Sequence, residues 1–256
     1  MPLPGQISVA INTVGAIVVL ALRRGMVETA TEASMHRQDA GSIRSMLQHK
    51  RAVVLVLCLT MGGSLYFYTF TTYMQKFLVV SAEMAPEQAS LLMSLALVAF
   101  MFMQPLFGLL SDRIGARASM RIFAILATLG AAPILFAIQG AQNSYQAFTL
   151  VLAGLTILAF YTPISGIIKA DLFPIEVRAL GVGLPYAVAN AIFGGTAEYV
   201  ALFLRSTGME TTFFYYVAGV TSISAIAALL MPDLRMHGYL DGDGEVERNT
   251  GLAWRR

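Results

Sequence analysis

The stretch AVVLVLCLTMGGSLYFYTFTTYMQ, residues 52–75, carries no charged side chain over its whole length. A helix needs about 20 predominantly apolar residues to cross the hydrocarbon core of a bilayer. This stretch meets that requirement and therefore predicts a transmembrane helix. It is also dense in hydroxyl groups between Ser64 and Tyr73, so we expect part of the helix to face a solvated cavity.

Five further windows of the same kind follow, each bounded by charge or by Pro and Gly: residues 89–110, 120–138, 145–168, 180–204 and 212–231. The chain is 57% hydrophobic and 12% charged, and this charged fraction is about half of what a soluble domain carries. We therefore predict an all-α membrane protein with a six-helix transmembrane region over residues 52–231, embedded in a lipid bilayer.

The segments that flank this region have a different composition. Residues 1–22 include a shorter apolar stretch and predict a partial transmembrane helix. Arg23 and Arg24 follow that stretch instead of preceding it, which argues against a secretory signal peptide. Residues 23–51 predict a polar cytoplasmic connector, and residues 232–256 predict a disordered cytoplasmic tail, because the tail holds too few apolar side chains to fold.

A short helix is expected near the end of the connector. Ser42 can cap it, and Ile43, Met46 and Leu47 then fall on one face. We expect this amphipathic helix to lie on the membrane surface.

The basic residues are distributed unevenly between the predicted loops. If the spans alternate in direction, all but two of the 17 Lys and Arg residues fall on one side, with Lys169 among them, and the exceptions are Lys76 and Arg205. The positive-inside rule places the basic side and the C-terminus in the cytoplasm. The positive charge is therefore explained by topology, and no nucleic-acid partner is expected. Seven crossings would put the first residues outside, which is natural for a carboxy-terminal piece of a longer protein.

Motifs of membrane enzymes are absent from the sequence: it has no HExxH, GxSxG or P-loop pattern and no paired cysteines. Its three histidines all lie in polar segments. The sequence therefore predicts neither an enzyme nor a metal site.

The segment GLLSDRIGAR, residues 108–117, connects the second and third predicted spans. It resembles the signature loop of the major facilitator superfamily, with matches at five positions and a departure at Ala116, where a basic residue is common. The matching residues are Gly108, Asp112, Arg113, Gly115 and Arg117. Gly108 can allow close helix approach, Gly115 can allow a tight reversal, and Asp112 can accept charge-assisted hydrogen bonds. These features predict a cytoplasmic gating contact, although a static turn would have nearly the same sequence.

The segment KADLFPIEVRALGVGLPYAVANAIFGGTAEYVALFLRSTGMET, residues 169–211, is similar to the metabolite:proton symporter family of the same superfamily. Pro174 can end one helix, and Glu176 and Arg178 can form an ion pair at the membrane surface. This arrangement predicts a second cytoplasmic gating contact, and the alternative is a surface salt bridge of small energetic value.

The resemblance covers nearly the whole chain, but only as the second half of a twelve-span transporter. It implies a six-helix half-domain over residues 52–231, a missing N-terminal six-helix half as partner, and location in the bacterial inner membrane. The implied function is proton-coupled uptake of a dicarboxylate, with alpha-ketoglutarate as the expected substrate and a proton gradient in place of a cofactor. The alternatives are a non-transporting remnant and a symporter of citrate, shikimate, or proline and betaine.

Glu198 is a carboxylate inside an apolar window. Helical spacing puts it on one face with Ala187, Asn190, Ala191 and Gly194, and we expect this small, polar face to look into the bundle or a cavity. A carboxylate in such a place must take a proton or pair with a cation. Glu198 is therefore the candidate for proton coupling, and a permanent ion pair with Lys76 or Arg205 is the alternative.

Other polar side chains on the spans are candidates for binding the substrate. They are Tyr68, Tyr73, Lys76, Tyr161 and Asn190. The cation of Lys76 could attract a dicarboxylate, or it could reach the lipid headgroups instead. The tyrosines and Asn190 could donate hydrogen bonds to a ligand or form contacts between helices.

Overall fold

The structure is a computed structural model that describes Leu20 and residues 42–232. The chain divides into two compact units, Met1–Ala40 and Gly41–Arg256. All but one of the described residues belong to the second unit. The partial helix predicted over residues 1–22, most of the connector and almost all of the predicted tail lie outside the described residues.

Five helical segments in the described part of the chain are long and apolar enough to cross a membrane: Lys50–Val80, Pro86–Ile114, Ala116–Gln139, Arg178–Ser206 and Glu210–Leu230. The first consists of α4 (Lys50–Tyr68), the π-helical segment η1 (Thr69–Tyr73) and α5 (Met74–Val80). The second and third are α6 (Pro86–Ile114) and α7 (Ala116–Gln139). The fourth contains α10 (Arg178–Ala189), the π-helical segment η2 (Asn190–Gly194) and α11 (Ala197–Ser206), and the fifth is α12 (Glu210–Leu230). Together with the divided window described next, they account for the six predicted windows and give an all-α, multi-pass membrane protein.

The window predicted over residues 145–168 is divided into α8 (Ser144–Ala159) and α9 (Ser165–Asp171), with turns between them. Pro163 lies in this break. Proline has no N–H to donate to the carbonyl one helical turn earlier, and it disfavours helical backbone at the residue before it. The break leaves Tyr161 and Thr162 on irregular backbone inside the bundle.

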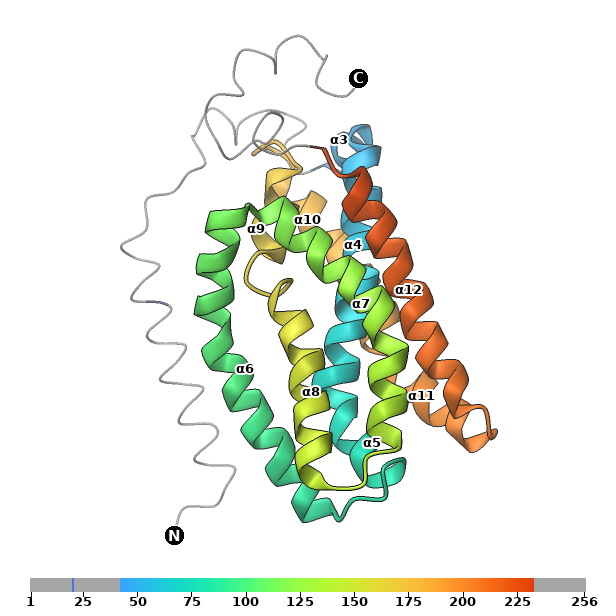
Figure 1. The fold of residues 1–256 in the computed structure, drawn as a ribbon. Helices are drawn as coiled ribbons and strands as arrows, with labels where there is room; N and C mark the ends of the chain where they lie inside the picture. Colours follow the sequence, from blue (N-terminus) through green and yellow to red (C-terminus); the bar gives the residue numbers. More distant parts are fainter. Residues whose placement is uncertain (1–19, 21–41, 233–256) are drawn as a thin grey trace. The chain divides into compact units, whose positions relative to one another are not determined.

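The helices pack as a bundle in which α12 lies against both α7 and α4, and α8 lies against α6 and α7 (Figure 1). The α10 helix and η2 pack on α4. Large exposed apolar side chains run along α6, as expected for a helix surrounded by lipid. They include Leu91, Leu95, Val98, Met101, Phe102, Leu106 and Leu109.

The short helix predicted near the end of the connector is present as α3 (Ile43–Gln48). The Ser42 side chain accepts a hydrogen bond from the backbone N–H of Ser45 at 3.1 Å, so the predicted cap is confirmed. Met46 is buried, whereas Ile43 and Leu47 are exposed. One residue of the apolar face therefore anchors the helix to the protein, and the other two remain available to a membrane surface.

Candidate functional site

Two π-helical segments, η1 and η2, interrupt the first and the fourth spans. The η1 segment packs against α11, and η2 packs against α4. A π-helical turn has a wider hydrogen-bonding pattern than an α-helix and is frequent at functional sites. The η2 segment approaches α4 closely at Gly194, because a Cβ on Gly194 would lie 2.7 Å from the ring of Tyr68, which ends α4.

A pocket of about 170 Å³ opens beside this contact. Its walls come from α4, the break before α9, α9 itself, α10 and η2. The lining residues are Gly63, Ser64, Phe67, Tyr68, Tyr161, Thr162, Ser165, Tyr186 and Asn190. Aromatic walls with a few hydroxyl and amide groups are typical of a site for a small polar ligand. No group of His, Cys, Asp and Glu side chains among the described residues could hold a metal ion.

Three of the five predicted substrate-binding residues, Tyr68, Tyr161 and Asn190, are brought together in this pocket. Tyr73 lies elsewhere: it is buried and packs against the rings of Phe77 and Phe213, with centroid distances of 5.9 and 5.4 Å. Lys76 is not part of the pocket lining.

Lys169 lies behind the pocket wall with only 2% of its surface exposed. Its Nζ donates a hydrogen bond to the Tyr161 hydroxyl at 3.0 Å and lies 4.8 Å from the centre of the Tyr186 ring. Lys169 therefore lies on a helix and is not an exposed loop cation, and its place on the cytoplasmic side stays a prediction. On α9, Ile168, Lys169 and Asp171 are buried, whereas Gly166 and Ile167 are exposed, so the lysine lies on the inner face of this helix.

Glu198 lies in the first turn of α11 and forms an ion pair with Lys76. The two side chains are 34% and 56% exposed, respectively. Of the two partners considered from sequence, the structure therefore shows Lys76. Asn190 and Gly194, on the same predicted face, point into the pocket wall and the core, but Ala187 and Ala191 are exposed.

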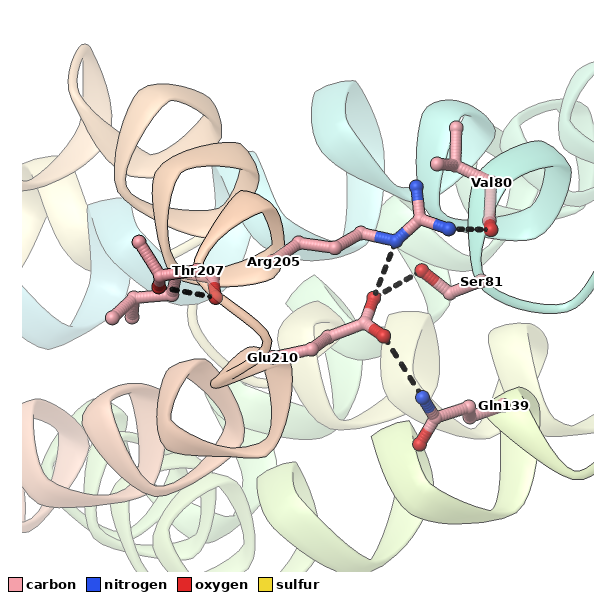
Figure 2. Close-up of polar contacts among 7 residues, drawn as sticks. Val80, Ser81, Gln139, Arg205, Thr207 and Glu210 are labelled. Carbon is pink, nitrogen blue, oxygen red and sulfur yellow. Dashed lines mark hydrogen bonds and ion pairs between the residues drawn. The ribbon is translucent and has the colours of Figure 1, made fainter.

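Arg205 belongs to a separate polar group, shown in Figure 2, which we call the Glu210 cluster. The carboxylate of Glu210 accepts hydrogen bonds from the Ser81 hydroxyl and from Gln139 Nε2, the latter at 2.9 Å, and lies 3.5 Å from Arg205 Nε. Arg205 also donates a hydrogen bond to the carbonyl oxygen of Val80. The cluster therefore joins the ends of α5, α7, α11 and α12.

The family of the chain follows from its comparison with known proteins. A family model described as Major Facilitator Superfamily matches residues 52–248. The chain belongs to this superfamily. No solved structure matches the chain significantly.

Curated members of the superfamily that resemble the chain are named as transport proteins. The alpha-ketoglutarate permease of Escherichia coli strain K12 is 51% identical over 88% of this chain and 52% of the permease. The inner membrane metabolite transport protein YhjE of the same strain is 29% identical over 74% of this chain and 44% of that protein. A citrate-proton symporter of Klebsiella pneumoniae is 26% identical over 83% of this chain and 48% of the symporter. The chain thus spans about half the length of these relatives.

The segment that resembles the signature loop of the superfamily, residues 108–117, comprises the last turns of α6, the reversal at Gly115 and the start of α7. Gly115 has φ 91° and donates its N–H to the Ser111 carbonyl at 2.8 Å, as expected for a glycine turn. The close helix approach expected at Gly108 is wrong, because a Cβ there would lie 3.9 Å from Pro163, an ordinary contact distance. Asp112 and Arg113 are exposed, and Arg117 is half-buried.

The second predicted gating contact lies between α9 and α10. Arg178 Nε donates a hydrogen bond to the Phe173 carbonyl at 3.2 Å. Glu176 interacts electrostatically with His49, and burial lowers the pKa of His49 despite the opposing effect of that carboxylate. The ion pair between Glu176 and Arg178 stays a prediction.

Several residues of the pocket were missed by sequence reasoning. Thr162 and Ser165 are ordinary hydroxyl residues in an apolar window, and nothing in their local sequence distinguishes them. Ser64, in contrast, begins the hydroxyl-rich stretch that was expected to face a solvated cavity. Lys169 had a usable signal, since it follows an apolar run and precedes the buried Leu172 and Phe173. A lysine between apolar residues is expected to have a partner inside the protein.

Proposed function

We propose that this chain is the carboxy-terminal six-helix half of a bacterial inner-membrane symporter that takes up alpha-ketoglutarate together with protons. The observation that carries the proposal is the 51% identity to a protein named alpha-ketoglutarate permease over 88% of this chain. The proposal includes a cytoplasmic C-terminus, a second six-helix half as partner, and a proton gradient as the energy source.

The chemistry of the pocket supports a small ligand that carries oxygen acceptors. Tyr68, Tyr161, Ser64 and Asn190 offer hydroxyl and amide donors on aromatic and glycine-containing walls. Hydrogen bonds to a carboxylate are charge-assisted and stronger than those to a neutral acceptor. In this proposal the pocket supplies one side of the substrate site, and the partner half supplies the other side and the remaining positive charge.

Glu198 is the proposed proton carrier, and its ion pair with Lys76 supplies the mechanism. In the structure the Glu198 carboxylate is paired with the Lys76 ammonium group. Protonation of Glu198 cancels the attraction and frees Lys76, which is then able to bind a substrate carboxylate. Tyr73 is close enough to Glu198 to interact with it electrostatically. We propose that Tyr73 responds to the loss of negative charge when Glu198 is protonated.

The cytoplasmic loops are proposed to hold the transporter in one of its two conformations. Gly115 sets the reversal that presents Asp112 and Arg113, while Gly108 and Arg117 flank it. Glu176 and Arg178 act at the neighbouring loop. Contacts of this kind are made in one state and broken in the other when one half rocks against its partner.

Uptake of radiolabelled alpha-ketoglutarate tests the proposal in cells that lack their own carrier for it. The chain is expressed alone and joined to the preceding half of the Escherichia coli permease. We expect uptake by the joined protein that rises as the external pH falls and stops when the proton gradient is collapsed. If neither the chain expressed alone nor the joined protein takes up alpha-ketoglutarate, the chain is a non-transporting remnant.

Two measurements separate the remaining alternatives. Competition by unlabelled citrate, shikimate, proline and betaine identifies another substrate if one of these inhibits more strongly than alpha-ketoglutarate does. In the joined protein, Glu198→Gln is expected to abolish the pH dependence of uptake, with Glu87→Gln, an exposed carboxylate of α6, as the matched control. A normal pH dependence in Glu198→Gln would show that the proton role is wrong.

A further inference from the structure

The ammonium group of Lys169 is buried. In the part of the chain that the structure describes, no carboxylate lies within ion-pair distance of its Nζ. Asp171 is also buried, but two residues apart on a helix do not face one another. The partners of Lys169 are instead the Tyr161 hydroxyl at 3.0 Å and two aromatic rings, those of Tyr186 and Tyr161, with centroids at 4.8 and 5.3 Å.

These partners satisfy the ammonium group only in part. An ammonium group has three N–H donors, and a single one reaches an oxygen acceptor here. The rings attract the cation through their π faces, but they do not neutralise it. A buried charge is costly unless an opposite charge approaches. The region behind the pocket wall therefore carries a positive charge that an anion in the pocket would balance.

While Lys169 is protonated, its hydrogen bond with Tyr161 has only one possible direction. An ammonium group donates and cannot accept, so the Tyr161 oxygen is the acceptor. The O–H proton of Tyr161 is then left for another acceptor, and its hydroxyl belongs to a residue of the pocket lining. Ser165, on the same wall, interacts with this hydroxyl as well and can either donate or accept. The adjacent cation polarises the phenol and makes it a stronger donor.

From this geometry we infer that Tyr161 and Lys169 form a carboxylate-binding element: Tyr161 donates its O–H to a carboxylate of the ligand, and Lys169 is the positioning cation behind it. The inference rests on the proposed function and goes further, because it assigns the charge that selects an anionic ligand to this half of the transporter. Tyr186 contacts both the pocket and the ammonium group, so it closes the cation off from the ligand and keeps the interaction indirect.

Thermal unfolding of the purified chain in detergent tests the inference. The probes are sodium salts of alpha-ketoglutarate, succinate and citrate, with zwitterionic betaine and the uncharged dimethyl ester of alpha-ketoglutarate for comparison, all at one ionic strength set with sodium chloride. The variants are Lys169→Met, Lys169→Arg and Tyr161→Phe. The matched control is Lys50→Met, which removes an exposed lysine at the start of α4.

At least one carboxylate is expected to raise the unfolding midpoint of the unchanged chain and of Lys50→Met. The apparent affinity for that carboxylate should fall about tenfold or more in Lys169→Met and in Tyr161→Phe, because a hydrogen bond to a charged group is lost. Lys169→Arg should recover part of the loss. Binding of the dimethyl ester should not change, and this separates a loss of charge selection from a general loss of structure.

The outcomes distinguish this inference from the proposed function. If alpha-ketoglutarate binds equally well to the unchanged chain, Lys169→Met and Tyr161→Phe, the carboxylate-binding element is wrong and the proposed substrate stands. If another carboxylate binds with the same dependence on Lys169 and alpha-ketoglutarate does not, the element stands and the proposed substrate is wrong. If no carboxylate stabilises the unchanged chain, or if Lys169→Met weakens the ester and the acid to the same extent, the inference is overturned.

Discussion

Replacing Glu210 by alanine removes the acceptor at which three side chains of the Glu210 cluster meet (Figure 2). The carboxylate is 17% exposed and lies in the first turn of α12, where the helix dipole also favours a negative charge. Without it, Ser81, Gln139 and Arg205 lose a shared partner. The ends of α5, α7 and α11 then lose their polar connection to α12.

The size of the effect follows from these contacts. A hydrogen bond to a charged group contributes about 1.5–3 kcal/mol when buried. The ion pair at 3.5 Å involves an Arg205 side chain that is 34% exposed, so it adds only about 0–1 kcal/mol. Water can replace part of the lost contacts at this partly exposed site. We therefore expect Glu210→Ala to lower the free energy of unfolding by about 2 kcal/mol, and Glu210→Gln, which keeps an acceptor oxygen, by about 1 kcal/mol.

Reversible unfolding in mixed micelles, followed by circular dichroism as the fraction of denaturing detergent rises, measures these differences. Glu87→Ala is the matched control, since Glu87 is exposed in the first turn of α6. It should change the free energy of unfolding by no more than about 0.5 kcal/mol. If Glu210→Ala and Glu87→Ala unfold with the same free energy, the cluster does not stabilise the bundle and the reasoning is refuted.

Three further predictions concern four positions in the described part of the chain. Gly63→Ala should lower the free energy of unfolding by about 1–3 kcal/mol, because a Cβ at this position would overlap the ring of Tyr161. Gly183 has open space around it, so Gly183→Ala should raise the free energy of unfolding by about 0.5–1 kcal/mol. The same micelle titration compares the two variants. Gly115→Ala should cost about 1–3 kcal/mol in that assay, because a side chain is strained at its backbone angles of φ 91° and ψ 138°. Burial lowers the pKa of His49, so folding disfavours the protonated imidazole. Stability should therefore fall as the pH drops below about 6.5, and His49→Gln should flatten this slope in unfolding curves measured at several pH values.

The sequence by itself determined the all-α membrane fold. In hydrocarbon every backbone N–H and C=O needs an internal partner, so an apolar stretch as long as residues 52–75 has to be a helix. Local chemistry also predicted the cap at Ser42 and the reversal at Gly115, since both depend on residues within a few positions. It could not predict the division of the fourth window, because proline is tolerated in many transmembrane helices and breaks only some of them.

Tertiary structure decided the site. Glu198 had two candidate cations, and the choice of Lys76, at a separation of 122 residues, depended on how two helices are rotated about their axes. The pocket likewise combines side chains from α4, the break at Pro163 and η2. From the sequence, Lys169 is expected to be an exposed cation, and only the packing of α9 buries its side chain. Helical periodicity specifies which residues share a face, but the packing of neighbouring helices determines what that face meets.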